Sequence, residues 1–190
     1  VRYPDQISSD MGLPILGAVP FIRGGGRVTD GGKDASHAIE AFREIRMNVA
    51  YAYGAAGPVV FTVSSAEAGD GKSFTSANLA MAFAQQGKRT LIIDGDIRRG
   101  RLHRFLGVSR TPGLSDLLSR QMPLREVVQQ TDVPLVSLIG SGTRMHVGPE
   151  LLGSSAMASH LHELKRNFDV IVIDSPPLGA GVDPYVLSAL

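Results

Sequence analysis

The chain has 190 residues, of which 43% are hydrophobic and 19% charged, proportions typical of a globular protein with a sizeable core. Its formal net charge of +1 indicates neither a nucleic-acid-binding surface nor an acidic tail. Cysteine is absent, which excludes disulfides, thiolate metal sites and a cysteine nucleophile, and no apolar run approaches the roughly 20 residues of a membrane-spanning helix.

The N-terminal part predicts a linker followed by a helix. Residues 1–32 contain three prolines and the Gly24-Gly25-Gly26 triplet, with one short apolar segment at residues 13–19. A helical pattern then runs from Asp34 or Ser36 to about Tyr53. We therefore divide the chain into a linker, 1–32, and a domain, 33–190.

The domain predicts an α/β fold built on a parallel sheet. Four short apolar runs separated by helical stretches predict buried strands, at residues 59–63, 90–93, 135–139 and 170–173. Alternation of this kind indicates a parallel sheet with helices on both faces.

A phosphate-binding loop is predicted between the first strand and the next helix. Residues 66–73 fit the pattern G-x-x-x-x-G-K-[ST], except that Ala66 takes the place of the first glycine. Such a loop directs backbone N–H groups and a helix N-terminus at a phosphate. Lys72 would reach the β- and γ-phosphates, and the Ser73 hydroxyl would bind Mg²⁺. The alternative is a glycine-rich turn that ends in a helix cap.

Acidic residues follow two of the other predicted strands. Asp94 and Asp96 come after residues 90–93, and Asp174 follows residues 170–173. Ligands of open α/β sheets bind outside the carboxyl ends of the strands, and Mg²⁺ prefers oxygen ligands, so these acids suit a site for a nucleoside triphosphate with Mg²⁺. The alternative is that they only form turns or helix caps.

Three motifs in this order resemble those of a known family. Residues 66–73 are similar to its Walker A motif, residues 92–98 to its Walker A′ motif (D-x-D-x-R after apolar residues), and residues 171–177 to its Walker B motif (D-x-P-P). The chain resembles the cytoplasmic kinase domain of bacterial tyrosine kinases attached to polysaccharide co-polymerases. The resemblance implies a P-loop NTPase-like fold, ATP or ADP and Mg²⁺ as ligands, and autophosphorylation on tyrosine that controls capsule or exopolysaccharide export.

The resemblance also assigns roles to residues. Lys72, Asp94 and Asp96 would be catalytic, with Asp94 the candidate base, and Ser73, Asp96 and Asp174 would bind the metal. Arg98 would orient phosphate or the Asp94–Asp96 pair. The nucleotide would contact the loop and this arginine, through Ala68, Gly69, Asp70, Gly71, Lys72, Ser73, Phe74 and Arg98.

Two further segments are similar to parts of the family that assemble or anchor it. Glu40, Arg43 and Arg46 are similar to an E-x-x-R-x-x-R element that joins copies of the chain into a ring; spacing alone favours a solvated helix face with an internal ion pair. Residues 13–20 look like the linker after a membrane span. The implied partners are therefore further copies of the chain and a membrane-spanning activator, fused N-terminally or on a separate chain, at the cytoplasmic face of the bacterial inner membrane.

The chain departs from the family pattern at its C-terminal end. It stops at Leu190, where the family continues with further strands, a base-binding region and a tyrosine cluster that is the substrate. The four tyrosines here are not clustered at a tail: Tyr3, Tyr51, Tyr53 and Tyr185. We expect a sheet that lacks its C-terminal strands, in a domain that is C-terminally incomplete.

Two other functions fit parts of the sequence. A Min/Par-type ATPase has the same sheet but carries a lysine five residues before the loop lysine, where this chain has Glu67. A non-catalytic, nucleotide-binding regulator of the same export machinery would look alike apart from its tyrosines. The basic run at residues 98–104 has no interleaved aromatic residue, so we expect no nucleic-acid partner.

Overall fold

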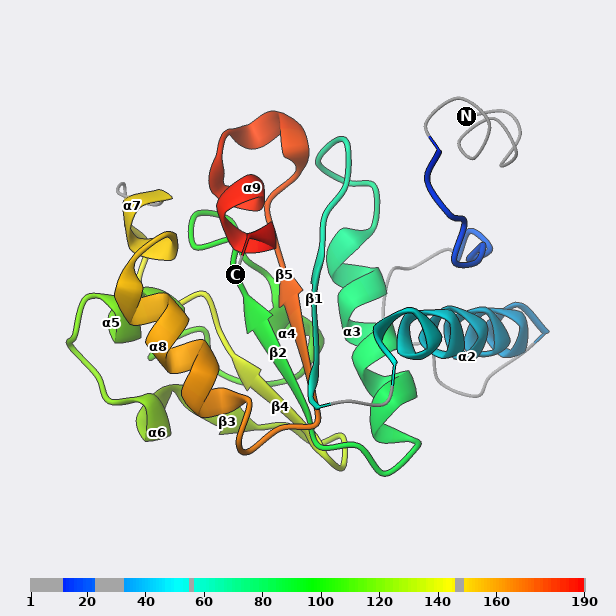
Figure 1. Cartoon of the computed structure of the whole chain (residues 1–190), viewed down its shortest axis with the longest axis horizontal. Coiled ribbons are helices and arrows are strands. Elements are labelled where there is room, and N and C mark those ends of the chain that lie inside the picture. The colour runs from blue at the N-terminus through cyan, green and yellow to red at the C-terminus, as the bar shows by residue number, and fades with distance from the viewer. Residues whose placement is uncertain (1–11, 23–32, 55–56, 146–148, 190) are drawn as a thin grey trace. The chain divides into compact units, whose positions relative to one another are not determined.

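The computed structural model describes residues 12–22, 33–54, 57–145 and 149–189 (Figure 1). These residues form two compact units. The first contains residues 12–22 and helix α2 (Lys33–Tyr53), and the second contains residues 57–145 and 149–189.

In the first unit, α2 begins slightly earlier than the sequence predicts, at Lys33. Residues 12–22 form no helix or strand. This segment packs on α2, because the Asn48 side chain donates a hydrogen bond of 2.7 Å to the Leu16 carbonyl and a Cβ atom at Gly17 would meet Ile45. The boundary at residue 32 stays a prediction, and residues 1–11 and 23–32 lie outside the described residues.

The second unit contains a five-stranded sheet in the order β1-β5-β2-β4-β3. All pairs are parallel except the β3–β4 pair. The strands are β1 (Val59–Val63), β2 (Thr90–Asp94), β3 (Val128–Gln130), β4 (Val136–Ile139) and β5 (Val170–Asp174). The predicted parallel α/β sheet is confirmed, and the antiparallel edge strand β3 was missed.

The missed strand and one boundary have local causes. β3 is a three-residue edge strand, Val-Gln-Gln, and shows no apolar run. Leu135, which the sequence places in a strand, is 46% exposed and has a φ of 66°, so it forms the turn before β4. Both differences come from short segments in which polar neighbours or a turn outweigh hydrophobicity.

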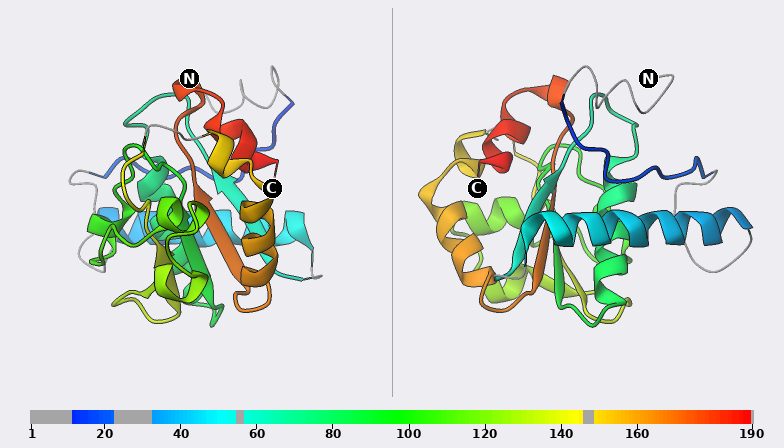
Figure 2. Two further views of the ribbon diagram at one scale, coloured as in Figure 1. Left: turned by 90° about the vertical axis from the view of Figure 1, so that its left-hand side faces the viewer. Right: turned by 45° about the vertical axis from the view of Figure 1, so that its right-hand side comes forward.

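Helices cover both faces of the sheet (Figure 1, Figure 2). Helix α3 lies on one face and α5, α6 and α8 lie on the other. The elements of this unit are α3 (Lys72–Ala84), α4 (Leu102–Phe105), α5 (Leu114–Leu118), α6 (Leu124–Val127), α7 (Pro149–Leu152), α8 (Ser155–Leu164), the 3₁₀ helix η1 (Leu178–Ala180) and α9 (Asp183–Ser188).

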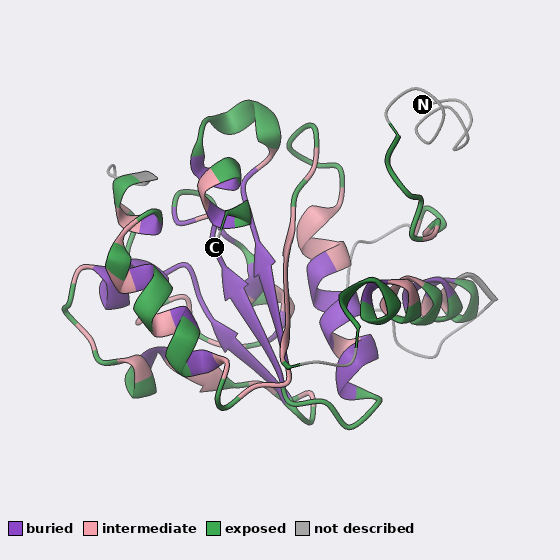
Figure 3. Ribbon diagram, in the orientation of Figure 1, coloured by how far each residue is buried: buried purple, intermediate pink, exposed green. Residues whose placement is uncertain are grey.

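Strands β2, β4 and β5 are buried on both faces, which explains their continuous apolar runs (Figure 3), and β1 is half-buried. Alternate residues such as Leu91, Ile93, Ile171 and Ile173 join one core cluster with Met157 and Leu161 of α8. The residues between them face α3, since side chains alternate along a strand. This packing fixes the register of β2 and β5, whose last residues, Asp94 and Asp174, lie opposite each other.

Candidate functional site

The loop between β1 and α3 has the conformation that a phosphate-binding loop requires. Gly69 and Gly71 have φ angles of 102° and 87°, in the left-handed region that favours glycine. Gly71 is the N-cap of α3, so Lys72 and Ser73 stand in the first turn of a helix of 13 residues. The loop residues from Ala66 to Asp70 are exposed, and the Glu67 N–H donates a hydrogen bond of 2.8 Å to the Asp70 carboxylate.

Asp174 links this loop to the end of β5. Its Oδ2 accepts a hydrogen bond of 2.6 Å from the Ser73 hydroxyl, and its Oδ1 accepts one of 2.9 Å from Ser76. Ser76, fully buried, was not predicted from the sequence, although its spacing of three residues from Ser73 places both on one face of α3. The structure therefore brings Ser73 and Asp174, two predicted metal ligands, into contact.

The segment after Asp174 also binds the phosphate loop. The Ser64 hydroxyl donates to the carbonyl of Pro176 at 3.0 Å, and the Leu178 N–H donates to the carbonyl of Ser65 at 2.8 Å. The prolines of the D-x-P-P motif thus hold extended backbone against the first half of the loop.

Asp94, at the end of β2, is completely buried. The N–H of Leu102 donates to its Oδ2 at 3.2 Å, and its Oδ1 has no hydrogen-bond partner. A Cβ atom at Gly100 would overlap this carboxylate, so only glycine fits beside it, a requirement that the sequence analysis missed. As a base, Asp94 would receive a proton from an outside hydroxyl only if the turn that covers it moves.

Asp96 is partly exposed and caps the turn that follows β2. Its Oδ1 accepts a hydrogen bond of 2.8 Å from the Arg99 N–H, and its carbonyl accepts one of 2.6 Å from the Gly100 N–H. The side chain of Arg98, in the middle of this turn, is about half exposed. Asp96 is therefore the member of the aspartate pair that a ligand reaches first.

Burial makes this cluster of carboxylates electrostatically unfavourable. Desolvation raises the pKa of Asp174 to about 6, against the lowering effect of the hydrogen bonds from Ser73 and Ser76 and of the charge of Lys72. Desolvation, and then the charge of Asp174, raise the pKa of Asp94 well above its usual range. A cation at this edge would relieve both effects.

The residues fit a magnesium ion of the kind that binds with a nucleotide. The Ser73 hydroxyl and the carboxylates of Asp174 and Asp96 are hard oxygen ligands. In the described part of the chain, no group of three or more His, Cys, Asp or Glu side chains is arranged to hold a metal by itself. Mg²⁺ in such sites takes few protein ligands and keeps waters and phosphate oxygens, so a nucleotide would supply the rest.

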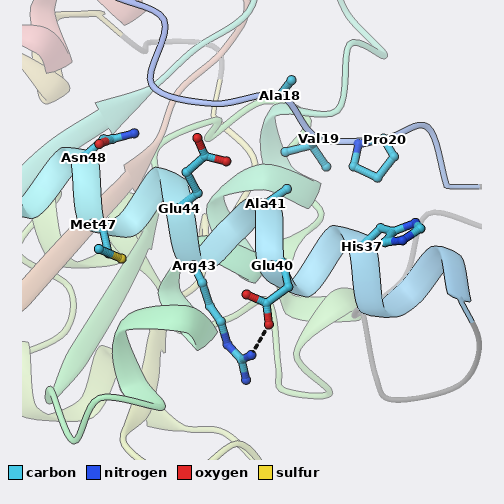
Figure 4. A pocket seen from close by; sticks show the side chains of 10 residues that line it. All are labelled: Ala18, Val19, Pro20, His37, Glu40, Ala41, Arg43, Glu44, Met47 and Asn48. Atoms are coloured by element: carbon cyan, nitrogen blue, oxygen red, sulfur yellow. Dashed lines mark hydrogen bonds and ion pairs between the residues drawn. The ribbon is translucent and has the colours of Figure 1, made fainter.

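The predicted assembly residues belong to the first unit, and Figure 4 shows two of them, Glu40 and Arg43. Arg43 and Glu40 form an ion pair on α2, next to a groove between this helix and residues 18–20. Arg46 lies one turn further along, where burial and then the charge of Arg43 lower its pKa. The intrahelical pair matches the alternative that spacing allowed, and a role in assembly stays a prediction.

Comparisons with known proteins show what the chain is similar to. A family model described as an AAA domain matches residues 59–184. The chain is 39% identical over 151 residues to the tyrosine-protein kinase ptk of Acinetobacter johnsonii, covering 80% of this chain and 21% of that protein. It is 32% identical over 158 residues to the putative tyrosine-protein kinase CapB of Staphylococcus aureus, covering 83% of this chain and 69% of that protein.

Solved kinase domains share almost the whole fold. The crystal structure of the chimerical protein CapA2B2 matches with a TM-score of 0.89 and 32% identity, covering 98% of this chain and 81% of that one. The kinase domain of the Escherichia coli tyrosine kinase ETK matches with a TM-score of 0.87 and 27% identity, covering 98% and 77%. The chain belongs to the bacterial tyrosine kinase family.

The P-loop kinase fold that the motifs implied is thus confirmed. The septum site-determining protein MinD of Pyrococcus horikoshii, solved with Mg-ADP, matches less completely, with a TM-score of 0.59 and 25% identity over 68% of this chain and 53% of that one. This difference, together with Glu67, places the chain with the kinases and not with the Min/Par ATPases. The chain spans about a fifth of the length of the ptk protein.

In the described part of the chain, no helix is both long enough and apolar enough to cross a membrane.

Proposed function

We propose that this chain is the ATP-binding domain of a protein-tyrosine kinase, which transfers the γ-phosphoryl group of ATP to a tyrosine hydroxyl. The main support is the 2.6 Å hydrogen bond between Ser73 and Asp174, which joins a phosphate loop to an acidic strand end beside Asp94 and Asp96. Phosphoryl transfer depends mainly on positioning and on neutralising charge, and this edge offers donors and carboxylates for both.

The loop residues bind and orient the phosphates. Backbone N–H groups of residues 68–74 would hold the phosphate oxygens, and Lys72 would offset the charge that grows on them during transfer. Ser73, Asp96 and Asp174 would hold Mg²⁺, Asp174 directly or through water. When bound, Mg²⁺ supplies positive charge to the phosphates and so favours attack by the hydroxyl.

The two aspartates after β2 have different environments and so different tasks. Asp94 is the candidate acceptor of the tyrosine proton, and its raised pKa suits proton transfer once the covering turn opens. Asp96, which is partly exposed, remains in place for the metal. Arg98 would contact the phosphates from the same turn.

The whole protein would act in polysaccharide export. We propose that it assembles into a ring through Glu40, Arg43 and Arg46, receives an activating membrane-spanning segment, and is tethered at the cytoplasmic face of the inner membrane. Its acceptor would be a tyrosine-rich tail, and nucleic acid has no part in the proposal. The support is the resemblance in sequence together with relatives that are named tyrosine-protein kinases.

A transfer assay separates this function from that of a non-catalytic regulator. The chain is incubated with labelled ATP, Mg²⁺ and a glutamate–tyrosine copolymer, and phosphotyrosine is measured. The Lys72→Met variant should lose at least about 100-fold in rate, because the charge on the transferring phosphate is no longer offset. Lys88→Met, which removes an exposed lysine beyond α3, should retain the parent rate.

Two results would contradict the proposal. Transfer at the parent rate by Lys72→Met would remove the loop lysine from the mechanism. Binding of Mg-ATP by the parent chain without any phosphorylation of the copolymer would favour the regulatory module.

A further inference from the structure

Asp183, in the first turn of α9, is a buried carboxylate that the proposed mechanism does not use. Its residue is 3% exposed, and its Oδ1 has no hydrogen-bond partner. Its Oδ2 lies 3.7 Å from Nη2 of Arg98, which forms an ion pair with it. A pair at this distance is held by charge and not by a hydrogen bond.

Such an arrangement is costly for stability alone. A buried carboxylate loses its hydration, and one partner beyond hydrogen-bond distance returns only part of that free energy. Asparagine or leucine at this position would avoid the cost. The charge of Asp183 therefore points to a task, and the side chain it acts on is Arg98.

The position of α9 is fixed closely against the active-site strands. Leu187, four residues after Asp183 and so on the same face of the helix, is buried, and its carbonyl accepts a hydrogen bond of 3.2 Å from the Thr62 hydroxyl. A Cβ atom at Gly95 would lie 2.7 Å from the Leu187 side chain, so the glycine between Asp94 and Asp96 allows α9 to approach. Asp183 is thus presented to Arg98 by a well-anchored helix.

We propose that Asp183 is a positioning residue, which holds the guanidinium of Arg98 at the carboxyl edge of the sheet in place to bind a nucleotide phosphate. The inference rests on the nucleotide site of the proposed function and adds a residue from outside its three motifs. Arg98 is about half exposed, whereas Asp183 is not, so the arginine can contact a ligand while its counter-charge stays buried. Without Asp183 the long arginine side chain would be free to move into solvent.

A double-mutant cycle tests this relation on the full chain. The dissociation constant of Mg-ATPγS is measured by calorimetry for the parent, Asp183→Asn, Arg98→Ala and the double variant, with thermal unfolding as a check of folding. Asp183→Asn should weaken binding by about tenfold, the order expected for one well-placed charge. In the Arg98→Ala background, the same change should not weaken Mg-ATPγS binding any further, because Asp183 acts through the arginine.

Control variants separate positioning from a general effect of charge or folding. Asp169→Asn removes the carboxylate of an exposed ion pair with Arg89, at the opposite end of the strands, and should leave binding unchanged. If Asp183→Asn does not fold, Asp183→Glu keeps the charge and should bind Mg-ATPγS within about threefold of the parent.

Three results would overturn the inference. The first is binding of Mg-ATPγS by Asp183→Asn with the parent's affinity, and the second is an equal loss of affinity from this change with and without Arg98. The third is a loss of affinity in Asp183→Glu as large as that in Arg98→Ala. Because the cycle measures nucleotide binding, it decides the role of Asp183 even if the parent chain transfers no phosphate to tyrosine.

Discussion

Asp174 is a site residue whose burial lowers the stability of the folded chain when no ligand is bound. It is 1% exposed and accepts hydrogen bonds from Ser73 and Ser76, yet burial still raises its pKa to about 6. Two serine hydroxyls therefore do not replace the water that a carboxylate loses. Residues selected for binding a cation commonly cost stability when the cation is absent.

The pKa shift of Asp174 predicts a pH-dependent effect of Asp174→Asn. The folded state holds the proton more tightly than the unfolded state, so the stability from this group is complete below about pH 4 and is lost as the pH rises through 6. In the absence of ligand, Asp174→Asn should therefore exceed the parent in free energy of unfolding at pH 7.5 by up to about 3 kcal/mol. The difference should shrink towards pH 4.5, as measured by urea unfolding across this range.

Added magnesium and nucleotide provide the control for this prediction. Mg-ADP should stabilise the parent at pH 7.5 and stabilise Asp174→Asn much less, because a ligand that binds the folded state more weakly raises the free energy of unfolding by less. A variant less stable than the parent at pH 7.5, or one with the same pH slope, would show that Asp174 is not strained by burial.

At the scale of elements, the turn between β2 and α4 protects Asp94. Asp96 accepts the backbone hydrogen bonds that close this turn, and Gly100 and Leu102 then lie against the carboxylate. In the Walker A′ motif, Asp96 therefore stabilises the turn that buries Asp94. This explains why a pattern of acids alone does not distinguish their roles.

Gly100→Ala should disturb this unit. The new methyl group would overlap the buried Asp94 carboxylate, which has little space to move, so we expect a loss of about 1–3 kcal/mol in the free energy of unfolding. Weaker binding of Mg-ADP should accompany it. Both quantities are measured directly, by urea unfolding and by calorimetry.

Gly179→Ala is a matched control near the same edge. Its added methyl group would meet only the Ala66 carbonyl, at the ordinary contact distance of 3.7 Å, so its unfolding free energy should change by less than about 0.5 kcal/mol. Equal stabilities of Gly100→Ala and the parent would mean that the turn has room which the structure does not show.

At the scale of the whole molecule, the proposed assembly would use a face of α2. Glu40 and Arg43 pair with each other on this helix, an interaction worth only a few tenths of a kcal/mol to the helix itself. Replacing Glu40, Arg43 and Arg46 together by alanine should therefore leave the melting temperature nearly unchanged. If these residues join copies of the chain, the triple variant should sediment as a smaller species than the parent.

The same sedimentation experiment can also contradict the assembly role. A variant that keeps the parent's mass would assign the three side chains to an ordinary solvated helix face. As a control, the double variant Lys33→Ala/Lys88→Ala changes two charged residues outside the E-x-x-R-x-x-R element and should keep the parent's mass.

Local sequence determined much of the fold and of the site. Strands buried on both faces need continuous apolar runs, so β2, β4 and β5 were predictable, and the half-buried β1 has an apolar run as well. The positive φ angles at Gly69 and Gly71 lie in the region that favours glycine. The edge strand β3 was not predictable, because it has only three residues, two of them glutamines, and pairs only with β4.

The sequence by itself therefore determined the phosphate loop, the acidic strand ends and the family to which they belong. Only the tertiary structure decided how these groups share the site: Ser76 joins Ser73 on Asp174, Gly100 covers Asp94, and Asp183 faces Arg98. These pairings depend on the order of the strands and on the packing of α3 and α9. The physical reason is that burial and charge act through space, between residues that are far apart in the chain.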